Sequence, residues 1–588
     1  MCGIVGCVSD EPVASILLQG LRRVEYRGYD SAGMATIAGG RLGVRKGAGR
    51  IEQIEEKHRL SELRGSVGMA HVRWATHGGV TDRNAHPHTS CEEKVAVVHN
   101  GIIENYLALK KQLTASGHQF KSETDTEVIA HLIEQEYGRV RDPVKATIAA
   151  TKKLAGQYAI AVMFQDRQDT IVGARKDAPL IIGLGDGKNF IASDVLAFIE
   201  YTDRTIFLDN LEVVKITRDK VEIFRRDGRE VRRDPTQVAW ELSDISKMDY
   251  AHYTLKEINE QPRTVVSAAM QDQAKLAKFA AAIRRAKSVF ITAAGTSYHV
   301  GLLMKSRLNN DVGLRCDAVL AGEFKEHAAF VKKGSVVIVL SQSGETADVL
   351  EAVKEAKKKG ARILSIVNAA GSTLARESDV ALLLNCGPEV GVAATKSFTA
   401  QVVVANLVVD ALLGKKRADG LKELSGAVEA ALRTEEQIVK IASIYRDRPD
   451  FYFVARGFHY PVALEGALKL KELSYIHAEG MPASELKHGT LALIEKGTPV
   501  VVINPSGGSH DDALSNAEEL RARGADVIGI SDSKDEVYAH FVKVPRIQEK
   551  YMPIVETIPL QLLAYHTAVA KRNDPDYPRN LAKSVTVK

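Results

Sequence analysis

Cysteine and long apolar runs are scarce in this chain. Its 588 residues include five cysteines, scattered and without any C-x-x-C pair, which favours neither a disulfide framework nor a zinc site. No apolar stretch approaches the roughly 18 residues of a membrane span, and the first residues lack the basic leader and apolar core of a signal peptide. We therefore expect no membrane partner, a reducing cytoplasmic location, and an amino terminus that is already that of the working protein.

A large excess of charge is missing too. Lysine and arginine total 79 against 74 acidic residues, which is too small a difference to indicate nucleic-acid binding without a clustered basic patch. The hydrophobic content of 45% is ordinary for a globular protein. Because domains usually hold about 100 to 200 residues, the length predicts roughly three of them.

The first 225 residues mix short strand patterns with helical ones. GIVGCV, VAVVH, YAIAVMF and TIVGAR have strand character, and residues 123–138 have helical periodicity. This mixture predicts an α+β domain over residues 2–225. Residues 226–245 are charged, lack periodicity and contain Pro235, which predicts an exposed linker.

The remainder of the chain contains an internal repeat. Residues 336–366 align without gaps with residues 500–530, and both segments have the pattern strand, turn, helix, strand. The repeat predicts two related α/β domains, 246–425 and 426–575, each with a parallel sheet flanked by helices. A short tail, 576–588, follows them.

Cys2 stands directly behind the initiator methionine. Removal of Met1 would leave its thiol beside a free α-amine with a pKa of about 7.7 to 8.0, which can act as a general base near neutral pH. One residue would then supply both nucleophile and base. For Cys7, which lies inside the apolar run, we expect a buried structural role.

Four other residues of the first domain could serve cysteine chemistry on a carbonyl. Asn100 and Gly101 are expected to end a strand at a tight turn, where an amide group and a backbone N–H can stabilise an oxyanion. Arg73 can bind a carboxylate and Asp125 an ammonium group. Alternatively, Asn-Gly is only a hairpin turn, and Thr124 or Asp125 only caps the next helix.

Histidines are frequent in the same domain, and they invite a metal hypothesis. No pair among them has a familiar ligand spacing supported by thiolate or carboxylate groups, so we expect no metal. Turn and supporting roles are expected instead for His71, His77, His86, His88 and His99.

In the first repeat, a buried strand is expected to end in the turn SQSGET (341–346), where a helix begins. Hydroxyls, backbone amides and a helix N-terminus at the carboxyl edge of a parallel strand favour a phosphate, although these are also ordinary turn residues. The second copy has Pro505 and His510 in place of Ser341 and Thr346. We therefore expect one phosphate pocket per chain, which the earlier turn AAGTSYH would complete with Thr296 and Ser297.

Two charged features of the second half are ambiguous. Glu465, Lys469 and Glu472 share one helix face, which fits either a catalytic group or a solvated stripe of ion pairs. Lys583 lies near the carboxyl end, where lysines usually face solvent.

The motifs MCGIVG, EYRGYDSAG, HVRWATHG, NAHPH, HNGIIEN and SETDTE resemble the class II glutamine amidotransferase domain, an N-terminal-nucleophile fold. The resemblance implies that Cys2 forms a glutamyl thioester and that Asn100 and the Gly101 amide form the oxyanion hole. It further implies glutamine-binding roles for Arg73, Thr76, His77 and Asp125. Trp74 would gate an ammonia channel, or would simply be a core aromatic residue.

AAGTSYH, SQSGET, GPEVGVAATKSFTAQ, ELKHG and PRNLAKSVTV resemble the sugar isomerase (SIS) domain pair of the glutamine:fructose-6-phosphate aminotransferases. This implies glutamine and fructose 6-phosphate as substrates, glucosamine 6-phosphate and glutamate as products, no cofactor, and a homodimer. The implied sugar-phosphate ligands are Thr296, Ser297, Ser341, Gln342, Ser343 and Thr346.

The same resemblance implies catalytic roles in the second half. Glu472 would move the proton between C1 and C2 with Lys469 as its electrostatic partner, and His488, which a neighbouring subunit could supply, would assist ring opening. Lys583 would form an imine with the ketose, helped by desolvation that lowers its pKa.

Two other functions compete. Another class II amidotransferase would need an ATP or pyrophosphoryl-sugar motif, and none follows residue 240. A sugar-phosphate sensor joined to an inert glutaminase would not need Cys2, Glu472, His488 and Lys583 together.

Overall fold

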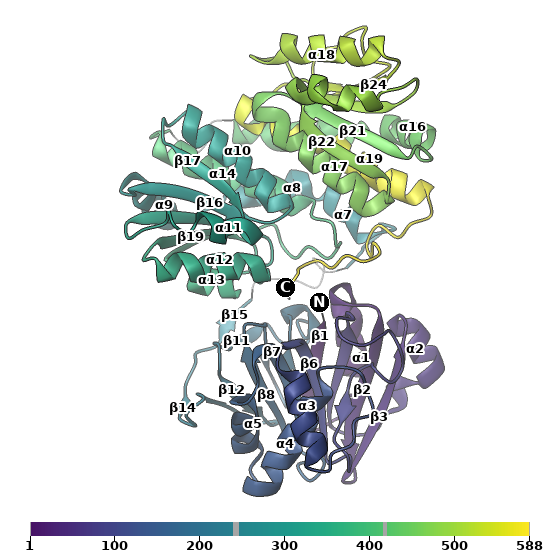
Figure 1. The fold of residues 1–588 in the computed structure, drawn as a ribbon, viewed down its shortest axis with the longest axis vertical. Coiled ribbons are helices and arrows are strands. Elements are labelled where there is room, and N and C mark those ends of the chain that lie inside the picture. Colours follow the sequence, from purple (N-terminus) through teal and green to yellow (C-terminus); the bar gives the residue numbers. More distant parts are fainter. Residues whose placement is uncertain (1, 239–245, 416–419, 587–588) are drawn as a thin grey trace. The chain divides into compact units, whose positions relative to one another are not determined.

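The computed structural model describes residues 2–238, 246–415 and 420–586. The chain forms two units, residues 1–245 with 584–588 and residues 246–583 (Figure 1). Each unit is described by itself.

Two antiparallel sheets build the first unit. Among its described residues, one sheet has the order β15 (Thr236–Gln237), β11 (Arg204–Phe207), β9 (Ile181–Gly185), β10 (Lys188–Ala192), β1 (Gly3–Ser9), β4 (Val67–Arg73), β2 (Ser31–Ala38), β3 (Arg41–Ala48). The other has the order β14 (Glu230–Val231), β13 (Val221–Phe224), β12 (Val213–Ile216), β8 (Ile171–Lys176), β7 (Gly156–Phe164), β6 (Val95–Ile103), β5 (His88–Thr89). The helices are α1 (Ala14–Val24), α2 (Ile51–His58), α3 (Tyr106–Ala115), α4 (Glu127–Val140) and α5 (Pro143–Thr151).

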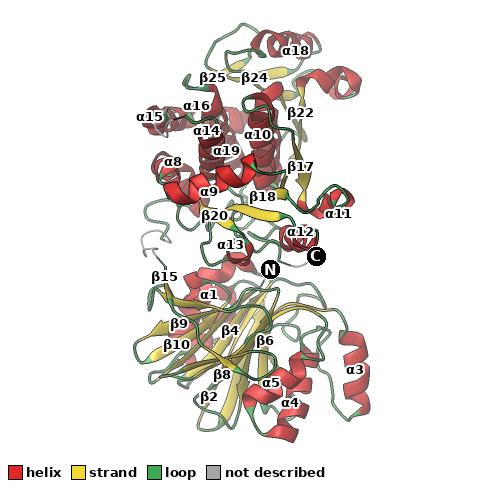
Figure 2. Cartoon of the chain, turned by 90° about the vertical axis from the view of Figure 1, so that its left-hand side faces the viewer, coloured by secondary structure: helices red, strands yellow, loops and turns green. Residues whose placement is uncertain are grey.

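Strand alternation stacks these elements in four layers. In β1, Val5 belongs to an apolar cluster with α1, whereas Ile4 belongs to the cluster between the two sheets. In β6, Val97 packs with α4 and α5, and Val98 contributes to the cluster between the sheets. Since successive side chains of a strand point to opposite faces, the order is helix, sheet, sheet, helix (Figure 2). This is the architecture expected of an N-terminal-nucleophile domain.

The expected linker is largely part of the first unit. β14 pairs with β13 and β15 pairs with β11, so residues 230–231 and 236–237 lie in its sheets. Arg233 also forms an ion pair with buried Glu212. Most of residues 226–238 are exposed, as expected. The sequence did not reveal the two short edge strands, because strands this short carry no periodic signal. Residues 239–245 of the expected linker lie outside the described residues.

Two parallel sheets build the second unit. Within the described ranges, the first has the order β17 (Cys316–Leu320), β16 (Ser288–Ala293), β18 (Ser335–Ser341), β19 (Arg362–Val367), β20 (Val380–Leu383), and the second has the order β22 (His477–Pro482), β21 (Asp450–Ala455), β23 (Pro499–Ile503), β24 (Asp526–Ser531), β25 (His540–Lys543). The repeat found in the sequence is therefore a repeat of structure. β18 and β19 enclose α12 (Ala347–Lys358), as β23 and β24 enclose α18 (His510–Ala522).

Helices join these two sheets around one core. The remaining ones are α7 (Tyr253–Asn259), α8 (Gln261–Ala269), α9 (Gln273–Arg284), α10 (Thr296–Asn310), α11 (Phe324–His327), α13 (Thr373–Glu377), α14 (Lys396–Leu412), α15 (Leu421–Leu432), α16 (Glu435–Tyr445), α17 (Tyr460–Ser474) and α19 (Met552–Ala570). A single apolar cluster runs from Ile258 to Ala568 and includes strands of both sheets. The two repeats therefore share one hydrophobic core. α14 and α19 are mostly apolar and lie buried in this core. No described helix is long and apolar enough to cross a membrane.

Candidate active site

Cys2 lies immediately before β1, in the middle of the first sheet. Its Sγ accepts a hydrogen bond from the Trp74 amide at 3.3 Å. The Arg27 guanidinium donates to the Cys2 carbonyl at 3.2 Å and pairs with Asp194 at 3.0 Å. Neither supporting residue was identified from the sequence, although Arg27 lies within the motif EYRGYDSAG. Met1 lies outside the described residues.

The thiol of Cys2 needs a base to become nucleophilic. Burial raises its pKa, which the Trp74 hydrogen bond and the positive charge of Arg73 only partly oppose. A thiol with a raised pKa is mostly protonated near neutral pH. A proton acceptor next to the sulfur is therefore required.

Asn100 and Gly101 lie within β6 and not at a turn, so both the expected strand end and the hairpin alternative are wrong. They face Ala159 and Tyr158 of β7 in regular antiparallel register. Gly101 has a φ of +128°, and a Cβ there would lie 2.1 Å from the Gln157 carbonyl oxygen. The Asn-Gly pair therefore marks a strained strand position that only glycine accommodates.

Within the described part of the chain, the side-chain amide of Asn100 is hydrogen-bonded through its oxygen and not through its nitrogen. His71 Nε2 lies 3.0 Å from Asn100 Oδ1 and 3.0 Å from the His99 carbonyl oxygen, so this ring nitrogen donates to both. Asn100 Nδ2 is buried and has no hydrogen-bond partner among the described residues. Buried amide donors are rarely left unpaired. A free donor of this kind is what an oxyanion hole requires.

Arg73, at the end of β4, is buried and holds the loop that follows it. Its guanidinium donates to the carbonyl oxygens of His77 at 2.5 Å and of Gly78 and Gly79 at 3.2 Å each. Thr76 is exposed and His77 half-buried on this loop. β4 is the neighbour of β1, the strand that Cys2 precedes. Arg73 thus places a positive charge, and the loop that it holds, at the end of β4.

Asp125 is buried and does not cap α4. That helix begins at Glu127, and its N-cap residue, Thr126, makes no side-chain capping bond. Asp125 Oδ2 instead accepts from the Ile103 amide at 2.7 Å, at the end of β6. This bond fixes the carboxylate at the end of the strand that carries Asn100.

The buried histidines support this arrangement as neutral rings. His71 and His86 stack with their centroids 4.2 Å apart. Burial lowers the pKa of His71 to about 3, and burial likewise lowers the pKa of His86 well below its usual value. Uncharged, His71 can orient Asn100 without competing for an anionic substrate.

Trp74 combines a half-buried ring with a backbone amide that donates to Cys2 Sγ. Its ring packs edge-on against Tyr29 with the centroids 5.6 Å apart. These contacts fit either of the expected roles, a gate or a packing aromatic.

In the second unit, the turn 341–346 lies between the end of β18 and the start of α12, as expected for an anion site. Ser341 Oγ accepts from the Gly344 amide at 3.0 Å, and Gly344 has a φ of +67°. Thr346 is the N-cap residue of α12 but makes no side-chain capping bond. The hydroxyl of Thr346 is therefore not used to close the helix start.

Two further bonds fix the middle of this turn. Ser343 Oγ accepts from the Glu345 amide at 3.2 Å. The Asn368 amide donates to the Gln342 carbonyl oxygen at 3.2 Å, which ties the turn to the loop that follows β19. The turn is thus held in place both by its own amides and by the neighbouring strand connection.

The charged face of α17 is buried, so the solvated-stripe alternative is wrong. Glu465 is 0% and Lys469 1% exposed. Glu465 accepts from Thr296 Oγ1 at 2.9 Å and lies 2.7 Å from His299 Nδ1, and both partners belong to α10 of the other repeat. Lys469 Nζ reaches Glu472 at 2.6 Å, and Glu472 is half-buried. The network therefore joins the two repeats at the start of α10 and leaves Glu472 accessible at its end.

A second contact involves the other expected hydroxyl of α10. Ser297 Oγ accepts from Gln401 Nε2 of α14 at 2.9 Å, and both residues are buried. Gln401 has no role among the expectations drawn from the sequence, since a glutamine in an apolar helix carries no distinctive signal.

The side chain of Lys583 is buried in the second unit, contrary to what its place near the chain end suggested. Its amino group lies 2.5 Å from Glu389 Oε2 and 2.8 Å from the Gly391 carbonyl oxygen. Lys583 and the amides of Thr395 and Ser397 overcome the effect of burial and lower the pKa of Glu389 to about 2. Glu389 lies in the motif GPEVG, but no role was expected for it from the sequence.

The tail before Lys583 is anchored by buried Asp576. Its carboxylate accepts from the Tyr253 and Thr254 amides at 2.8 Å each, at the start of α7. The tail is thus fastened to the second unit ahead of the lysine. Residues 587–588 lie outside the described residues.

His488 is separate from these contacts. It ends a short 3-10 helix, Ala483–His488, and is exposed. Across the described parts of the chain, no hydrogen bond or ion pair joins it to Glu472 or Lys583.

Fold and site together define a class: an N-terminal-nucleophile glutamine amidotransferase domain followed by two SIS domains. Family models agree, because the glutamine amidotransferase domain matches residues 71–200 and the SIS domain matches residues 282–411 and 444–571. A solved structure, the C-terminal domain of glucosamine-fructose-6-phosphate aminotransferase from Francisella tularensis, is 35% identical with a TM-score of 0.53 and covers 56% of this chain and 99% of its own.

Full-length relatives give the family. The glutamine–fructose-6-phosphate aminotransferase (isomerizing) of Thermococcus kodakarensis is 46% identical, and that of Methanothermobacter thermautotrophicus 45% identical, each over 100% of both chains. The chain belongs to the isomerizing glutamine–fructose-6-phosphate aminotransferase family.

Proposed function

We propose that this chain transfers the amide nitrogen of glutamine to fructose 6-phosphate and isomerises the product to glucosamine 6-phosphate, releasing glutamate. The observation that carries the proposal is the burial of Lys583 against Glu389. Removing a lysine from water is costly unless a partner compensates its charge, and Glu389 is that partner here. An amine held inside a sugar-isomerase unit fits imine chemistry on a ketose.

In the first unit, Cys2 acts as the nucleophile on the glutamine side-chain amide. After removal of Met1, its own α-amine takes the thiol proton and delivers it to the departing ammonia. Asn100 Nδ2 and the Gly101 amide stabilise the oxyanion of the tetrahedral intermediate. Arg73 binds the α-carboxylate of glutamine, and Asp125 its α-ammonium group. Water then hydrolyses the thioester to glutamate.

Thr76 and His77 line the glutamine loop in this proposal, and Trp74 gates the passage of ammonia. The three residues follow Arg73 closely in the chain, so its bonds to the loop carbonyl groups position all of them.

In the second unit, the phosphate binds where hydroxyl groups meet the start of a helix. Ser341, Gln342, Ser343 and Thr346 lie in one turn, and α10 contributes Thr296 and Ser297. Helix N-termini favour anions because their amides point outward and the helix dipole is positive there.

The sugar chemistry then runs in four steps. His488 assists ring opening. Lys583, after losing its proton to solvent, attacks the C2 ketone, and the ketone oxygen leaves as water when the imine forms. Ammonia displaces the lysine from this imine. Glu472 removes the C1 proton and returns it to C2, while Lys469 stabilises the carboxylate of Glu472 by their 2.6 Å ion pair.

Glutamate release, measured with and without fructose 6-phosphate, tests this function. We expect strong stimulation by the sugar together with formation of glucosamine 6-phosphate. A Cys2→Ala variant is expected to lose glutamine-dependent synthesis and still bind the sugar. Glutamate release without any amino sugar would point to an unrelated acceptor and overturn the proposal.

We further propose a homodimer in which His488 completes the sugar site of the neighbouring chain. The exposure of His488 in a single chain supports this arrangement. The free state of all five cysteines suits a reducing cytoplasm, which we propose as the place of action.

Mixing two inactive variants tests the shared site. If His488 acts across a two-fold dimer, mixing His488→Asn with Glu472→Gln yields mixed dimers that contain one intact site, and roughly a quarter of full activity returns after subunit exchange. If each chain uses its own His488, the mixture stays inactive. Light scattering establishes the dimer independently.

A further inference from the structure

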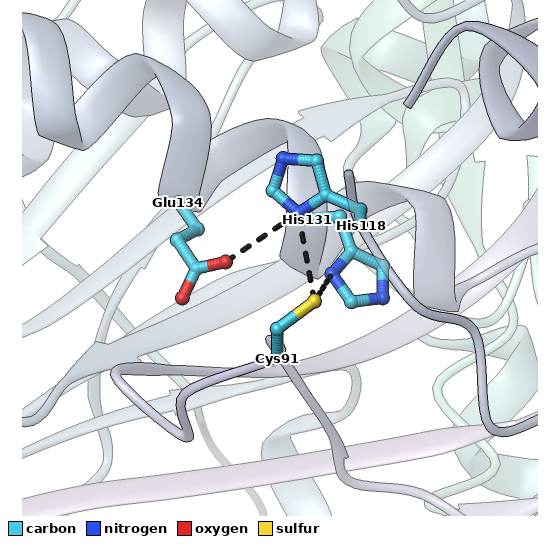
Figure 3. A group of neighbouring side chains, drawn as sticks. All are labelled: Cys91, His118, His131 and Glu134. Carbon is cyan, nitrogen blue, oxygen red and sulfur yellow. Dashed lines mark hydrogen bonds and ion pairs between the residues drawn. The ribbon is translucent and has the colours of Figure 1, made fainter. Parts of the chain in front are cut away.

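Four side chains of the first unit that the proposed reaction does not use converge on one point. Cys91 lies in the turn before β6, His118 in the segment after α3, and His131 and Glu134 lie one turn apart on α4. Their ligand atoms all lie within 4.8 Å of one another. Figure 3 shows the sulfur, two ring nitrogens and a carboxylate oxygen directed toward a common centre.

The distances within this cluster fit a tetrahedral metal ion. Cys91 Sγ lies 3.7 Å from His118 Nδ1 and 3.5 Å from His131 Nδ1. His118 Nδ1 lies 3.6 Å from Glu134 Oε2. Zinc bonds of about 2.3 Å to sulfur and 2.0 Å to nitrogen or oxygen imply tetrahedral edges of roughly 3.6 Å for S–N and 3.3 Å for N–O. These three edges are close to these lengths, and the other pairs of ligand atoms lie within 4.8 Å.

Neighbouring groups orient the candidate ligands. His131 Nε2 lies 3.5 Å from Glu127 Oε1 but makes no hydrogen bond among the described residues. A proton on Nε2 would face this carboxylate and leave the Nδ1 lone pair toward Cys91. A carboxylate behind a ligating histidine is a common feature of zinc sites. The Gln119 amide donates to Cys91 Sγ at 3.2 Å, which suits a thiolate.

The carboxylate of Glu134 faces the cluster with Oε2, and its other oxygen is unpaired within the described ranges. Glu134 Oε1 is buried and has no hydrogen-bond partner among the described residues. Buried polar atoms are seldom left unpaired unless an ion or water completes them. The three ligand types, thiolate, imidazole and carboxylate, are those that Zn²⁺ uses.

We propose that Cys91, His118, His131 and Glu134 form a structural zinc site. Four protein ligands leave no open position, so the ion would not act on substrate. From the sequence we expected no metal, because the histidines considered there were those at 71 to 99. The four ligands come from three segments, and only H-x₂-E on α4 is local.

The site has a structural consequence for glutamine binding. Glu127 accepts from the Lys121 amide at 2.7 Å and the Ser122 amide at 2.6 Å. Through His131 and Glu127, zinc would therefore fix the segment between α3 and α4. That segment leads to Asp125, so the site would stiffen the part of the chain that carries the proposed ammonium acceptor.

Metal analysis of the full chain tests the proposal. Protein freed of metal with a chelator, incubated with zinc chloride and desalted is expected to retain about one zinc per chain. Cobalt in place of zinc is expected to give the charge-transfer absorption of a cobalt–thiolate bond. Zinc is expected to raise the melting temperature of wild type.

Matched variants separate the site from adventitious binding. Cys91→Ser and His131→Gln are expected to lose the bound zinc and the melting shift, and Cys91→Ser to lose the thiolate band. Cys316→Ser, which removes a buried thiol of the second unit, is expected to change none of these. Glu127→Gln is expected to weaken zinc affinity roughly 10- to 100-fold.

Two outcomes would overturn the zinc site. One is a wild-type chain that retains no zinc, and the other is a Cys91→Ser chain that retains as much as wild type. Circular dichroism of each variant shows whether it is folded, and the cobalt spectrum of wild type reports thiolate ligation without depending on any variant.

Discussion

The amino group of Lys583 lies 2.5 Å from Glu389 Oε2, and the two side chains are 4% and 0% exposed. The ion pair joins a residue near the chain end to the segment between β20 and α14. Such a pair depends on both members, because either charge alone would be buried without compensation.

Substitution of Lys583 can separate the effect of its positive charge on stability from its proposed role in imine formation. Lys583→Arg retains a cation for Glu389 but cannot form an imine, since a guanidinium stays protonated. We expect a melting temperature near that of wild type and loss of amino-sugar formation. Lys583→Ala is expected to lose activity and also about 3–5 kcal/mol of stability. Borohydride with fructose 6-phosphate is expected to add mass to wild type and not to Lys583→Arg; normal turnover by Lys583→Arg would contradict the imine.

Asn100→Ala removes the unpaired amide donor. We expect kcat for glutamine hydrolysis to fall by about 10²- to 10³-fold with little change in KM, because an oxyanion forms only during the reaction. Asn105→Ala is the matched control, since its amide bonds the Lys153 carbonyl group instead, and its kcat is expected to stay near wild type. An Asn100→Ala variant altered mainly in KM would place this side chain in ground-state binding.

Gly101→Ala introduces a Cβ beside the Gln157 carbonyl group at a φ of +128°. We expect a lower melting temperature and impaired glutamine hydrolysis, because β6 must shift. Gly138→Ala is the control, since a Cβ there has no neighbour within 4 Å near the end of α4, and it is expected to stabilise the chain by about 0.5–1 kcal/mol. Thermal melts of both variants check this; equal melting temperatures would refute the steric argument.

Because of His459, the folded chain is expected to lose stability as the pH rises above neutral. Burial lowers its pKa, but ion pairs with Glu556 and Glu549 outweigh burial and raise it to about 10. A histidine whose pKa is raised on folding stabilises the folded chain. This stabilisation is complete below the pKa of the unfolded chain, about 6.5, and is lost as the pH rises through 10. We expect melting temperatures of wild type to fall between about pH 7 and 10.

A paired substitution isolates this effect. His459→Leu combined with Glu556→Leu removes the buried pair together, so its melting temperature is expected to fall less steeply over the same pH range. Parallel slopes for the two proteins would show that another group titrates.

The sequence predicted the elements with strong local patterns. The expected strands GIVGCV and YAIAVMF lie in β1 and β7, and the repeated strand, helix, strand units are present as expected. Alternation and helical periodicity are local properties, which explains this agreement. The Asn100–Gly101 pair was misleading, because a glycine suits both a hairpin and a strained strand position.

Residue chemistry and chain order determined that a thiol follows the first methionine, that a hydroxyl-rich turn follows β18, and that the second half is a repeat. Tertiary structure alone decided that Lys583 is buried beside Glu389, that Glu465 links the two repeats, and that Cys91 meets His118, His131 and Glu134. The reason is physical: burial and electrostatic pairing depend on contacts between distant segments, which local sequence patterns do not encode.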